Sequence, residues 1–563
     1  MDLISKAQEQ AKELIVSAVE SAQIDGLLPQ VEIPAFTVEI PADTTHGDFA
    51  ANIAMTGARA FRMPPAKIAA AIADKLDLAG TFFTRTQIAG PGFLNLFVSQ
   101  FWFSDALLLI DELGAQYGRV NIGGGKKVMV EFVSANPTGP MHMGNARGGV
   151  IGDVLASVLE ATGHNVEREF YLNDTGLQIE KFGKSLEARY LQKYLGEDAP
   201  AFPEDGYHGE DITDLSDLFA QTHGDKYVSS GEEERREALV AFALPRNISD
   251  MRDTLGQYRI QYDTWFPDSS LHADGSVMRV IEVLRERGMV YEKDGAVWYA
   301  ASKMGGEKDE VLIRANSHPT YFAVDIAYHY NKFHTRGFET VINLCGADHH
   351  GHVARMKAAM DAVGLSGDAL DIIIFQHVRL MKDGEPYRMS KRSGRSVTLS
   401  DLLDIVSVDA ARFFFNMREI GAAMDFDLDL AVREDSQNPV YYVQYAHARI
   451  CSIEKKLIAE NIDFANITRE EYDLLKTPDE TGLIRLLAGL SGVIAGAAAR
   501  YDTACLTRCA IDTATLFHKF YTNCHVMVED RHLRRARAGL CMATRTVLAA
   551  LLSLLKVSAP ESM

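Results

Sequence analysis

The stretch "ANPTGPMHMGNARGG", residues 135–149, lies between an apolar run, "KVMVEFV" (127–133), and a helix-like segment, "VIGDVLASVLEATG" (150–163). A glycine-containing turn from a buried strand into a helix brings backbone N–H groups, and about half a positive charge, up to a phosphate. Gly144 and Gly148 would let a nucleotide approach, and His142 adds a donor. A ligand-free turn explains the glycines equally well. The spacing fits neither the dinucleotide fingerprint nor the Gly-Lys-Ser/Thr phosphate loop, so it predicts another nucleotide site or none.

Further strand-like runs alternate with helical segments after this turn. They are "VEREFYLND" (166–174), "VINLCGAD" (341–348) and "DIIIFQHVRLM" (371–381). This alternation predicts an α/β domain with a parallel sheet and crossover helices, over residues 113–436. An acidic, polar stretch at about 195–300 is expected to be an insertion into it. Residues 1–112, with the strand-like "FLNLFV" (93–98), are expected to form a small α+β domain, and residues 437–563 an all-α domain.

Composition restricts the class of protein. The chain has 563 residues, 47% of them hydrophobic, and a formal net charge of −20. No global basic field indicates a nucleic-acid partner, although a local basic face can still bind one. Six cysteines in a chain of this length indicate reduced thiols and a cytoplasmic protein. The N-terminal segment does not resemble a signal peptide, and the apolar run "VLAALLSLL" (547–555) is too short to span a membrane. We therefore expect no membrane partner.

A second stretch, "YRMSKRSGRSVTLSDLL" (387–403), contains a lysine flanked by arginines beside a glycine. Such a loop can clamp a polyphosphate, because charge-assisted contacts strengthen as the leaving pyrophosphate gains charge. Alone it would be an ordinary basic surface loop. Together with "HMGN" (142–145), it resembles the two signatures of the class I aminoacyl-tRNA synthetases, which are His-Ile-Gly-His and Lys-Met-Ser-Lys-Ser.

Within that class the chain resembles the arginyl-tRNA synthetases over nearly its whole length. The matching stretches are "EFVSANPTGPMHMGNARG" (131–148), "YLNDTGLQIEKFGKSL" (171–186), "PTYFAVDIAYHYNKF" (319–333), "CGADHHGHVARMKAA" (345–359) and "VYYVQYAHARI" (440–450). The resemblance implies a Rossmann-like catalytic domain, an N-terminal domain that contacts the tRNA elbow and a helical anticodon-binding domain. It also implies that arginine attacks ATP to give an arginyl adenylate, from which the arginyl group passes to the 2′-OH of the tRNA's terminal adenosine.

By this resemblance, His142, Asn145 and Lys391 are the catalytic groups, and ATP is used with Mg²⁺. The implied ATP-binding residues are Gly144, Gly346, Asp348, Met389, Ser390 and Lys391. Two positions depart from the signatures. Asn145 replaces the second His and can donate a hydrogen bond but cannot be protonated, and Arg388 replaces the first Lys and keeps its charge.

Arginine recognition is the more specific expectation, because arginine presents a planar, always charged fork of five donors. Tyr321 and Asp325 are four residues apart and share a face if their segment is helical. The resemblance implies that these two hold the guanidinium. It implies that Glu131, Ser134, Asn136 and His349 hold the α-amino end. From the residues alone, a surface carboxylate would be the better interpretation of Asp325.

Two other functional classes are possible. In "GADHHGH", Asp348, His349, His350 and His352 resemble the ligand cluster of a metal-dependent phosphoesterase, but no upstream Asp clusters match and the basic loop would have no role. A non-catalytic tRNA-binding relative is disfavoured by the intact Lys391 and Asp325. Cys505 and Cys509 fit a helix core better than zinc, so no resident metal is expected. Arg531, Arg534 and Arg535 have helical spacing and are expected to contact tRNA, and the protein is expected to be a monomer.

Overall fold

A five-stranded parallel sheet lies at the centre of the molecule, in a computed structural model that describes residues 3–41, 43–306, 308–347, 351–387 and 397–563. Its strands are β5 (Lys127–Glu131), β6 (Asn165–Leu172), β7 (Thr264–Pro267), β11 (Thr340–Gly346) and β12 (Leu370–Phe375). They are ordered β12-β11-β5-β6-β7. The predicted parallel sheet is therefore confirmed. The strand order reverses between β5 and β11, the kind of switch point at which such sheets bind ligands.

Helix α6 (Gly144–Ala161) connects β5 to β6, and small residues let it lie close to the sheet. A Cβ on Gly148 would stand 2.8 Å from the Phe375 ring, and a Cβ on Gly152 would stand 2.3 Å from Phe132. Gly148 therefore serves helix–sheet packing. The Cβ position of Gly148 faces the half-buried Phe375 ring, so this glycine does not leave the open space for a nucleotide that the sequence suggested.

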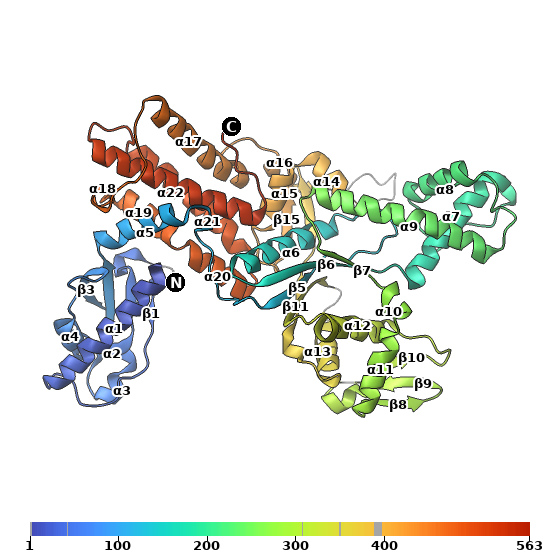
Figure 1. Cartoon of the computed structure of the whole chain (residues 1–563), viewed down its shortest axis with the longest axis horizontal. Helices are drawn as coiled ribbons and strands as arrows, with labels where there is room; N and C mark the ends of the chain where they lie inside the picture. Colours follow the sequence, from blue (N-terminus) through green and yellow to red (C-terminus); the bar gives the residue numbers. More distant parts are fainter. Residues whose placement is uncertain (1–2, 42, 307, 348–350, 388–396) are drawn as a thin grey trace.

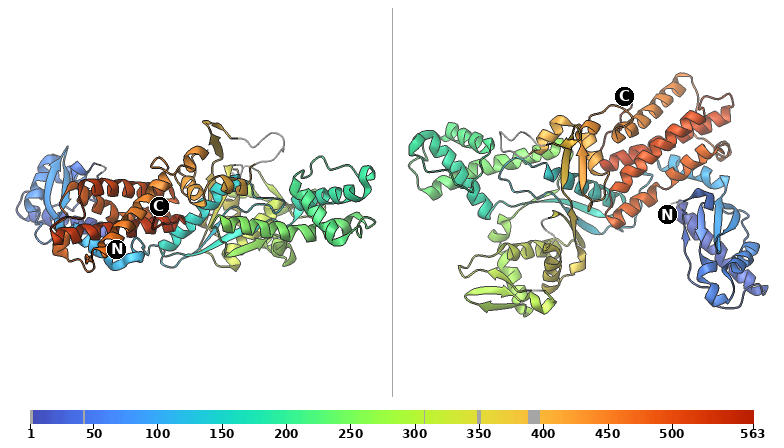
Figure 2. Two further views of the ribbon diagram at one scale, coloured as in Figure 1. Left: turned by 90° about the horizontal axis from the view of Figure 1, so that it is seen from above. Right: turned by 180° about the vertical axis from the view of Figure 1, so that it is seen from behind.

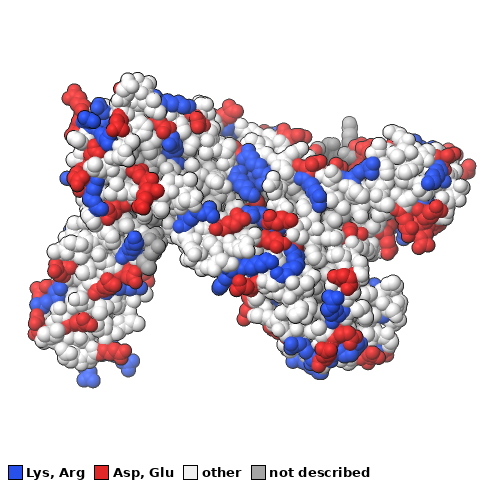
Figure 3. Space-filling model, viewed as in Figure 1, with Lys and Arg blue, Asp and Glu red and all other residues white. Residues whose placement is uncertain are grey.

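The chain leaves the sheet twice, where the sequence suggested a single insertion at about 195–300. The first excursion, between β6 and β7, consists of α7 (Gly176–Leu195), α8 (Glu210–His223) and α9 (Glu232–Gln257), which project from one end of the molecule (Figures 1 and 2). On the face shown in Figure 3, Asp and Glu side chains gather on this projecting end. Strand β7, inside the range expected to be insertion, is the edge strand of the central sheet.

The second excursion separates β7 from β11. It comprises α10 (Ser269–Ala273), α11 (Ser276–Glu286), a three-stranded antiparallel sheet and α12 (Tyr321–Tyr330). The small sheet consists of β8 (Val290–Lys293), β9 (Ala296–Tyr299) and β10 (Glu310–Ile313). After β11 come α13 (His352–Ala362), β12, β13 (Val378–Lys382), β14 (Glu385–Pro386), α14 (Leu399–Ile405), α15 (Val408–Phe415), β15 (Met424–Asp427) and α16 (Leu428–Ala431). Helix α12 of this excursion and α13, which follows β11, both contribute residues to the cavity at the carboxyl ends of the strands.

The N-terminal region is a separate α+β unit at the other end of the molecule (Figures 1 and 2). Its antiparallel sheet, ordered β1-β2-β4-β3, contains β1 (Val38–Glu39), β2 (Phe49–Ala51), β3 (Phe83–Ala89) and the predicted strand β4 (Phe93–Val98). The helices are α1 (Leu3–Ile24), α2 (Ile53–Thr56), α3 (Ala58–Phe61), α4 (Pro65–Lys75) and α5 (Gln100–Leu113). The Arg485 guanidinium, from the C-terminal helices, lies 2.5 Å from the Asp48 carboxylate and ties this unit to them.

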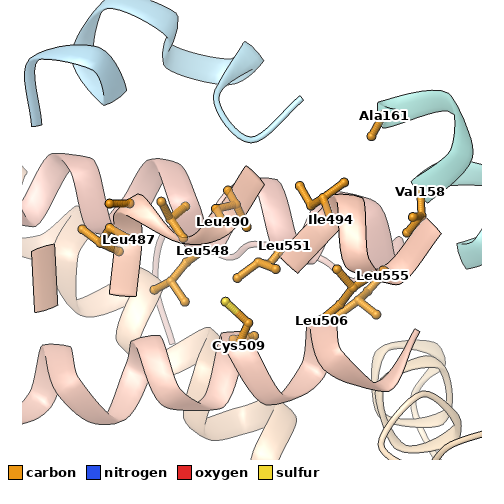
Figure 4. Close-up of a cluster of buried hydrophobic side chains, with 14 of the residues drawn as sticks. Val158, Ala161, Leu487, Leu490, Ile494, Leu506, Cys509, Leu548, Leu551 and Leu555 are labelled. Atoms are coloured by element: carbon orange, nitrogen blue, oxygen red, sulfur yellow. The ribbon is translucent and has the colours of Figure 1, made fainter. Parts of the chain in front are cut away.

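From Pro439 the described chain is helical, as predicted. The helices are α17 (Pro439–Ala459), α18 (Arg469–Tyr472), α19 (Pro478–Ala488), α20 (Leu490–Arg500), α21 (Ala504–Asn523) and α22 (Arg531–Leu555). In Figure 4, Leu490, Leu551 and Cys509 meet in one apolar cluster that reaches Val158 and Ala161 of α6. The interpretation of Cys509 as a core residue is confirmed, since it is 5% exposed.

Two segments of this bundle, Pro478–Arg500 and Arg531–Leu555, are long and apolar enough to cross a membrane by length and composition alone. The sequence expectation considered only the uninterrupted run 547–555, so it missed the longer windows. In the structure, 50% of the first window and 61% of the second are buried against other helices. Burial of this kind is typical of core helices, which pass the same test of length and composition.

Candidate active site

A cavity of about 1060 Å³ opens at the carboxyl ends of the central strands. Strands β5, β6, β11 and β12 contribute Glu131, Tyr171, Asn343, Cys345 and Ile372 to its wall. The second excursion and α13 supply the rest, including Tyr299, Lys308, Glu310, Asp325, Tyr328, His329, His352 and Arg355. The cavity therefore lies at the switch point of the sheet, and several carboxylates face it.

The segment after β5 holds the first predicted binding residues. Val133 and Ser134 have φ values of 70° and 45°, a left-handed conformation that is uncommon for residues other than glycine. The Ser134 hydroxyl donates to Glu131 Oε1 at 2.9 Å and accepts from the Tyr171 backbone N–H at 3.1 Å. Glu131 and Ser134, which the resemblance assigns to the α-amino end, are thus in contact with each other. Asn136 lies further along the loop and is exposed.

The start of α6 presents His142, Gly144 and Asn145. The Gly144 backbone N–H donates to His142 Nδ1 at 2.9 Å, so this ring nitrogen is an acceptor. The imidazole is then neutral and carries its proton on Nε2, and the His142 side chain belongs to an exposed residue. Among the described residues, the neighbouring side-chain atoms within 4 Å of a Cβ position on Gly144 all belong to the His142 ring. The geometry suits the approach of a phosphate oxygen.

The two signature stretches are joined by backbone hydrogen bonds. Met143 N–H donates to the Val397 carbonyl at 2.9 Å, and Leu399 N–H donates to the Met141 carbonyl at 2.8 Å. His142 and Thr398 form an antiparallel bridge between these bonds. Met389, Ser390 and Lys391 lie outside the described residues, but the end of their segment is attached beside His142. Asp348 and His349 also lie outside the described residues, and Gly346 ends β11 next to the cavity-lining Cys345.

Tyr321 and Asp325 lie on α12, so the predicted helical spacing is confirmed. The Thr320 hydroxyl caps the helix by accepting from the Ala323 N–H. Asp325 reaches the cavity, whereas Tyr321 is 57% exposed and its hydroxyl accepts from the Leu177 N–H at 3.4 Å. Tyr321 is absent from the described cavity wall. It links α12 to the start of α7 at the edge of the site.

Asp325 lies deep in the protein, although 37% of its side-chain surface faces the open cavity. Removal from bulk water, together with the nearby charges of Glu131 and Asp268, raises the pKa of Asp325 to about 7. Arg355 and Lys332 act in the opposite direction and lower this pKa. Of the described basic groups, the His352 ring is the one within ion-pair range of Asp325: its Nε2 lies 3.7 Å from Asp325 Oδ2. A cation that entered the cavity would stabilise the ionised carboxylate.

His352 was a member of the metal-like cluster. Its Nδ1 lies 2.9 Å from Arg355 Nη2, and Arg355 also contacts Glu310 at 3.1 Å. A histidine that binds a metal through one ring nitrogen normally donates a hydrogen bond from the other. A guanidinium has donors only, so it cannot accept that bond. His350 lies outside the described residues, and no group of three potential metal ligands occurs among the residues that the structure describes.

Several site residues were missed by sequence reasoning. Lys332 is fully buried and lies 2.5 Å from Glu131 Oε2. Arg147, in the first signature stretch, is also fully buried and donates to the carbonyls of Gln376, Glu419 and Ala422. Burial lowers the pKa of Arg147 to about 10.

The three C-terminal arginines differ in environment. Arg531 is exposed and Arg534 is half-buried, with a contact to the Val528 carbonyl at 3.3 Å. Arg535 is 8% exposed and lies 2.7 Å from both Glu471 and Asp463. The Arg535 guanidinium is therefore occupied inside the bundle, which is the physical reason against its expected contact with tRNA.

Comparisons with known proteins agree with this architecture. Residues 9–98 match a model described as the arginyl tRNA synthetase N-terminal domain. Residues 108–420 match the catalytic domain of class I (R) tRNA synthetases, and residues 443–563 match the DALR anticodon-binding domain. An arginine–tRNA ligase from Caldanaerobacter subterraneus is 52% identical over 562 residues, which cover 100% of both chains.

A second relative, an arginine–tRNA ligase from Ruminiclostridium cellulolyticum, is 50% identical over 99% of both chains. In fold, the chain is similar to the solved arginyl-tRNA synthetase of Thermus thermophilus, with a TM-score of 0.72 at 22% identity over 99% of this chain and 100% of that one. Neither the phosphoesterase nor the non-catalytic alternative is consistent with such full-length identity to ligases. The chain thus belongs to the arginyl-tRNA synthetases, class I enzymes that use ATP to charge tRNA with arginine for translation.

Proposed function

We propose that Asp325 receives the guanidinium of arginine. One observation supports this most strongly. Asp325 lines a large cavity at the switch point of the sheet, and nearby basic groups only partly offset the burial and acidic neighbours that raise its pKa. A guanidinium is planar, always charged and suited to bidentate contact with a carboxylate. Tyr321 adds a hydroxyl on the same helix. A bound guanidinium would offset the charge repulsion that raises the pKa of Asp325.

The α-amino end would lie at the carboxyl end of β5. Glu131, Ser134 and Asn136 offer acceptors there, and His349 is assigned to the same end by its place in the sequence. Lysine presents an ammonium group and cannot satisfy two acceptors arranged for a planar fork. Each buried acceptor left unpaired costs about 1–3 kcal/mol, which is enough to discriminate strongly between amino acids without an editing step.

ATP would lie along the start of α6. The Nε2–H of His142 can donate to a phosphate oxygen, Gly144 leaves space for it, and Asn145 adds a second donor. Gly346 and Asp348 would hold the ribose, while Met389, Ser390 and Lys391 would close over the phosphates. Mg²⁺ would accompany ATP and keep several of its waters.

The chemical step then depends on position and charge. The arginine carboxylate attacks the α-phosphate, the bond to the pyrophosphate breaks, and an arginyl adenylate forms. Lys391 and His142 would stabilise the charge that accumulates on the departing pyrophosphate. In the second step the 2′-OH of the terminal adenosine attacks the arginyl carbonyl, and AMP leaves.

The helical domain offers a surface for anticodon bases. Tyr441 and Tyr445 on α17 are stacked at 6.3 Å, and Tyr445 is 37% exposed. The Arg449 guanidinium lies 5.0 Å above the Tyr445 ring and 5.1 Å above the Tyr521 ring. Aromatic faces beside a guanidinium bind unstacked bases. Arg531 and Arg534 would contribute phosphate contacts further along the bundle. We infer a cytoplasmic monomer with no membrane partner.

Substitution of Asp325 tests the arginine site. Asp325→Asn keeps the shape of the side chain and removes its charge, so arginine affinity should fall about 10- to 100-fold, since a hydrogen bond to a charged group is worth about 1.5–3 kcal/mol. ATP affinity of the same variant is the internal control and should stay within about twofold. Calorimetry with each ligand measures both. Unchanged arginine affinity would show that the guanidinium binds elsewhere.

Amino-acid-dependent ATP–pyrophosphate exchange tests the wider assignment. Arginine should support exchange, and none of the other standard amino acids should support it at a comparable rate. Assays with and without tRNA separate adenylate formation from transfer.

A further inference from the structure

Lys332 is a fully buried lysine behind the wall of the active-site cavity, where it contacts the wall residues Glu131 and Asn343. It lies in the π-helical turn Asn331–Thr335 that continues α12, seven residues after Asp325. Its ammonium lies 2.5 Å from Glu131 Oε2 and 3.3 Å from Asn343 Oδ1, and it stands 3.9 Å from the centre of the Tyr328 ring. The side chain therefore connects α12 with the carboxyl ends of β5 and β11. π-Helical turns of this kind are frequent at functional sites.

Glu131 is held from both sides. Ser134 donates to Oε1 at 2.9 Å and Lys332 donates to Oε2. A carboxylate has about four lone-pair positions, so each oxygen can still accept one further bond from a ligand. The two contacts fix the plane of the Glu131 carboxylate. They therefore also fix the directions of its remaining lone pairs.

Charged groups from several elements lie near Asp325 or line the same cavity, Lys308 among them. Glu131 on β5, Asp268 after β7 and Glu310 on β10 are acidic, while Lys332, Arg355 and His352 are basic groups. His329, one turn after Asp325, is fully enclosed, and burial together with Lys332 and His352 lowers its pKa well below the ordinary value. His329 is therefore neutral. Of these basic groups, Lys332 is the fully buried one, and its ammonium contacts Glu131.

We propose that Lys332 is a positioning residue for arginine: it fixes the Glu131 carboxylate and offsets its charge, so that Asp325 is the anionic group left to receive the guanidinium. This inference rests on the assignment of Asp325 under the proposed function. It gives the pocket a polarity, with a neutral ion pair at the α-amino end and a net negative charge at the side-chain end. Arginine would then bind in one orientation.

The test compares four variants of the full-length enzyme. Lys332→Met removes the charge at similar length, and Lys332→Arg keeps the charge. The double variant Lys332→Met/Glu131→Gln removes both members of the pair, so that no buried carboxylate is left without its partner. Arg235→Met is the matched control, because Arg235 forms a buried ion pair with Glu187 at 2.8 Å in the projecting helices, away from the cavity.

Arginine and ATP dissociation constants are measured by calorimetry between pH 6 and pH 9, with thermal unfolding alongside. Lys332→Met should raise the dissociation constant of arginine at least tenfold at pH 7.5, and the dissociation constant of ATP should stay within twofold of the wild-type value. Its pH midpoint for arginine binding should move to higher pH, because Lys332 helps to keep Asp325 ionised. Lys332→Arg should restore most of the affinity. In the double variant the midpoint should return towards the wild-type value, while the affinity stays low because the Glu131 contact is gone.

A purely structural role would give another pattern. Lys332→Met would then lower the melting temperature, as Arg235→Met does, with arginine affinity and pH midpoint as in the wild type, and the inference would be overturned. If Lys332→Met does not fold, wild-type arginine affinity in the double variant overturns it equally. Should Asp325→Asn leave arginine binding unchanged, the proposed function fails first. Should Asp325→Asn weaken binding while Lys332→Met does not, the role of Lys332 alone fails.

Discussion

At the scale of single residues, Asp325 predicts the pH dependence of arginine binding. Its pKa is raised to about 7, and the ionised form is the one that accepts a guanidinium. As pH falls through 7 the carboxyl group is protonated, so arginine affinity should fall about tenfold per pH unit below 7 and level off above pH 8. At pH 6, binding should release about one proton per arginine, measured by calorimetry in buffers of different ionisation enthalpy. Equal affinities at pH 6 and pH 8 would contradict the assignment.

Lys391 carries a second prediction at this scale, made from the sequence because this residue lies outside the described residues. Lys391→Ala should slow arginine-dependent ATP–pyrophosphate exchange by about 10²- to 10³-fold, since its charge is needed mainly while pyrophosphate leaves. Arginine affinity should stay within about twofold. Arg379, which is exposed and paired with Asp425, offers a control through Arg379→Ala. A near-normal exchange rate would remove Lys391 from the mechanism.

Sequence reasoning reached the residues of the site unevenly. Asp325, Glu131 and Ser134 were reached through the resemblance to the arginyl-tRNA synthetases, since the residues alone favoured a surface carboxylate for Asp325. Lys332 and Arg147 were missed because a lone charge is usually a surface residue. The burial of Arg535 was not foreseen, because its partners, Glu471 and Asp463, lie more than sixty residues earlier in the chain. Burial by distant segments is not visible in local spacing.

At the scale of elements, the glycines of α6 predict how closely this helix must approach the sheet. Gly152→Ala should destabilise the protein by about 1–3 kcal/mol, because the new methyl group would overlap the Phe132 ring. Gly492, on α20, has no atom within 4 Å of a Cβ position. Gly492→Ala should stabilise by about 0.5–1 kcal/mol through helix propensity. Urea unfolding measures both, and a destabilisation of equal size in the two variants would refute the packing argument.

Among the elements, alternation of apolar runs was enough to predict the parallel sheet and its crossover helices. It did not reveal β7, since "TWFP" is a four-residue edge strand inside acidic, polar sequence. The single insertion expected at about 195–300 therefore became two excursions. Short edge strands depend on a neighbour, here β6, for their hydrogen bonds. Their own sequence carries little signal.

At the scale of the whole molecule, the C-terminal end of the chain contacts the helix that carries the first signature, and the N-terminal unit contacts the C-terminal bundle. Asp153, buried on α6, lies 2.6 Å from both Arg412 and Lys556 and 3.3 Å from Arg168. Lys556 follows α22, the last helix of the C-terminal bundle. The N-terminal unit contacts the same bundle through Asp48 and Arg485. A tRNA held by the N-terminal unit and the helical bundle would therefore act on elements in direct contact with α6.

We predict that arginine activation itself requires tRNA. The resemblance to arginyl enzymes suggests this requirement, and the physical account is a shift of populations: the loops that close over ATP would be competent only rarely in the free enzyme. Coupling of about 3 kcal/mol would raise a state populated near 1% to a majority. Because the protein carries a net charge of −20, tRNA must bind through local basic surface, so the effect should weaken as salt increases.

The decisive assay is pyrophosphate exchange with arginine and ATP, run with and without tRNA whose terminal adenosine cannot accept arginine. Exchange should be low without tRNA, rise at least tenfold with it and fall again at high salt. A tRNA of another specificity is the control, since it supplies the same phosphates without the matching anticodon contacts. Full exchange in the complete absence of tRNA would mean that the site is already assembled in the free enzyme. The contacts of α6 with the C-terminal bundle would then serve stability alone.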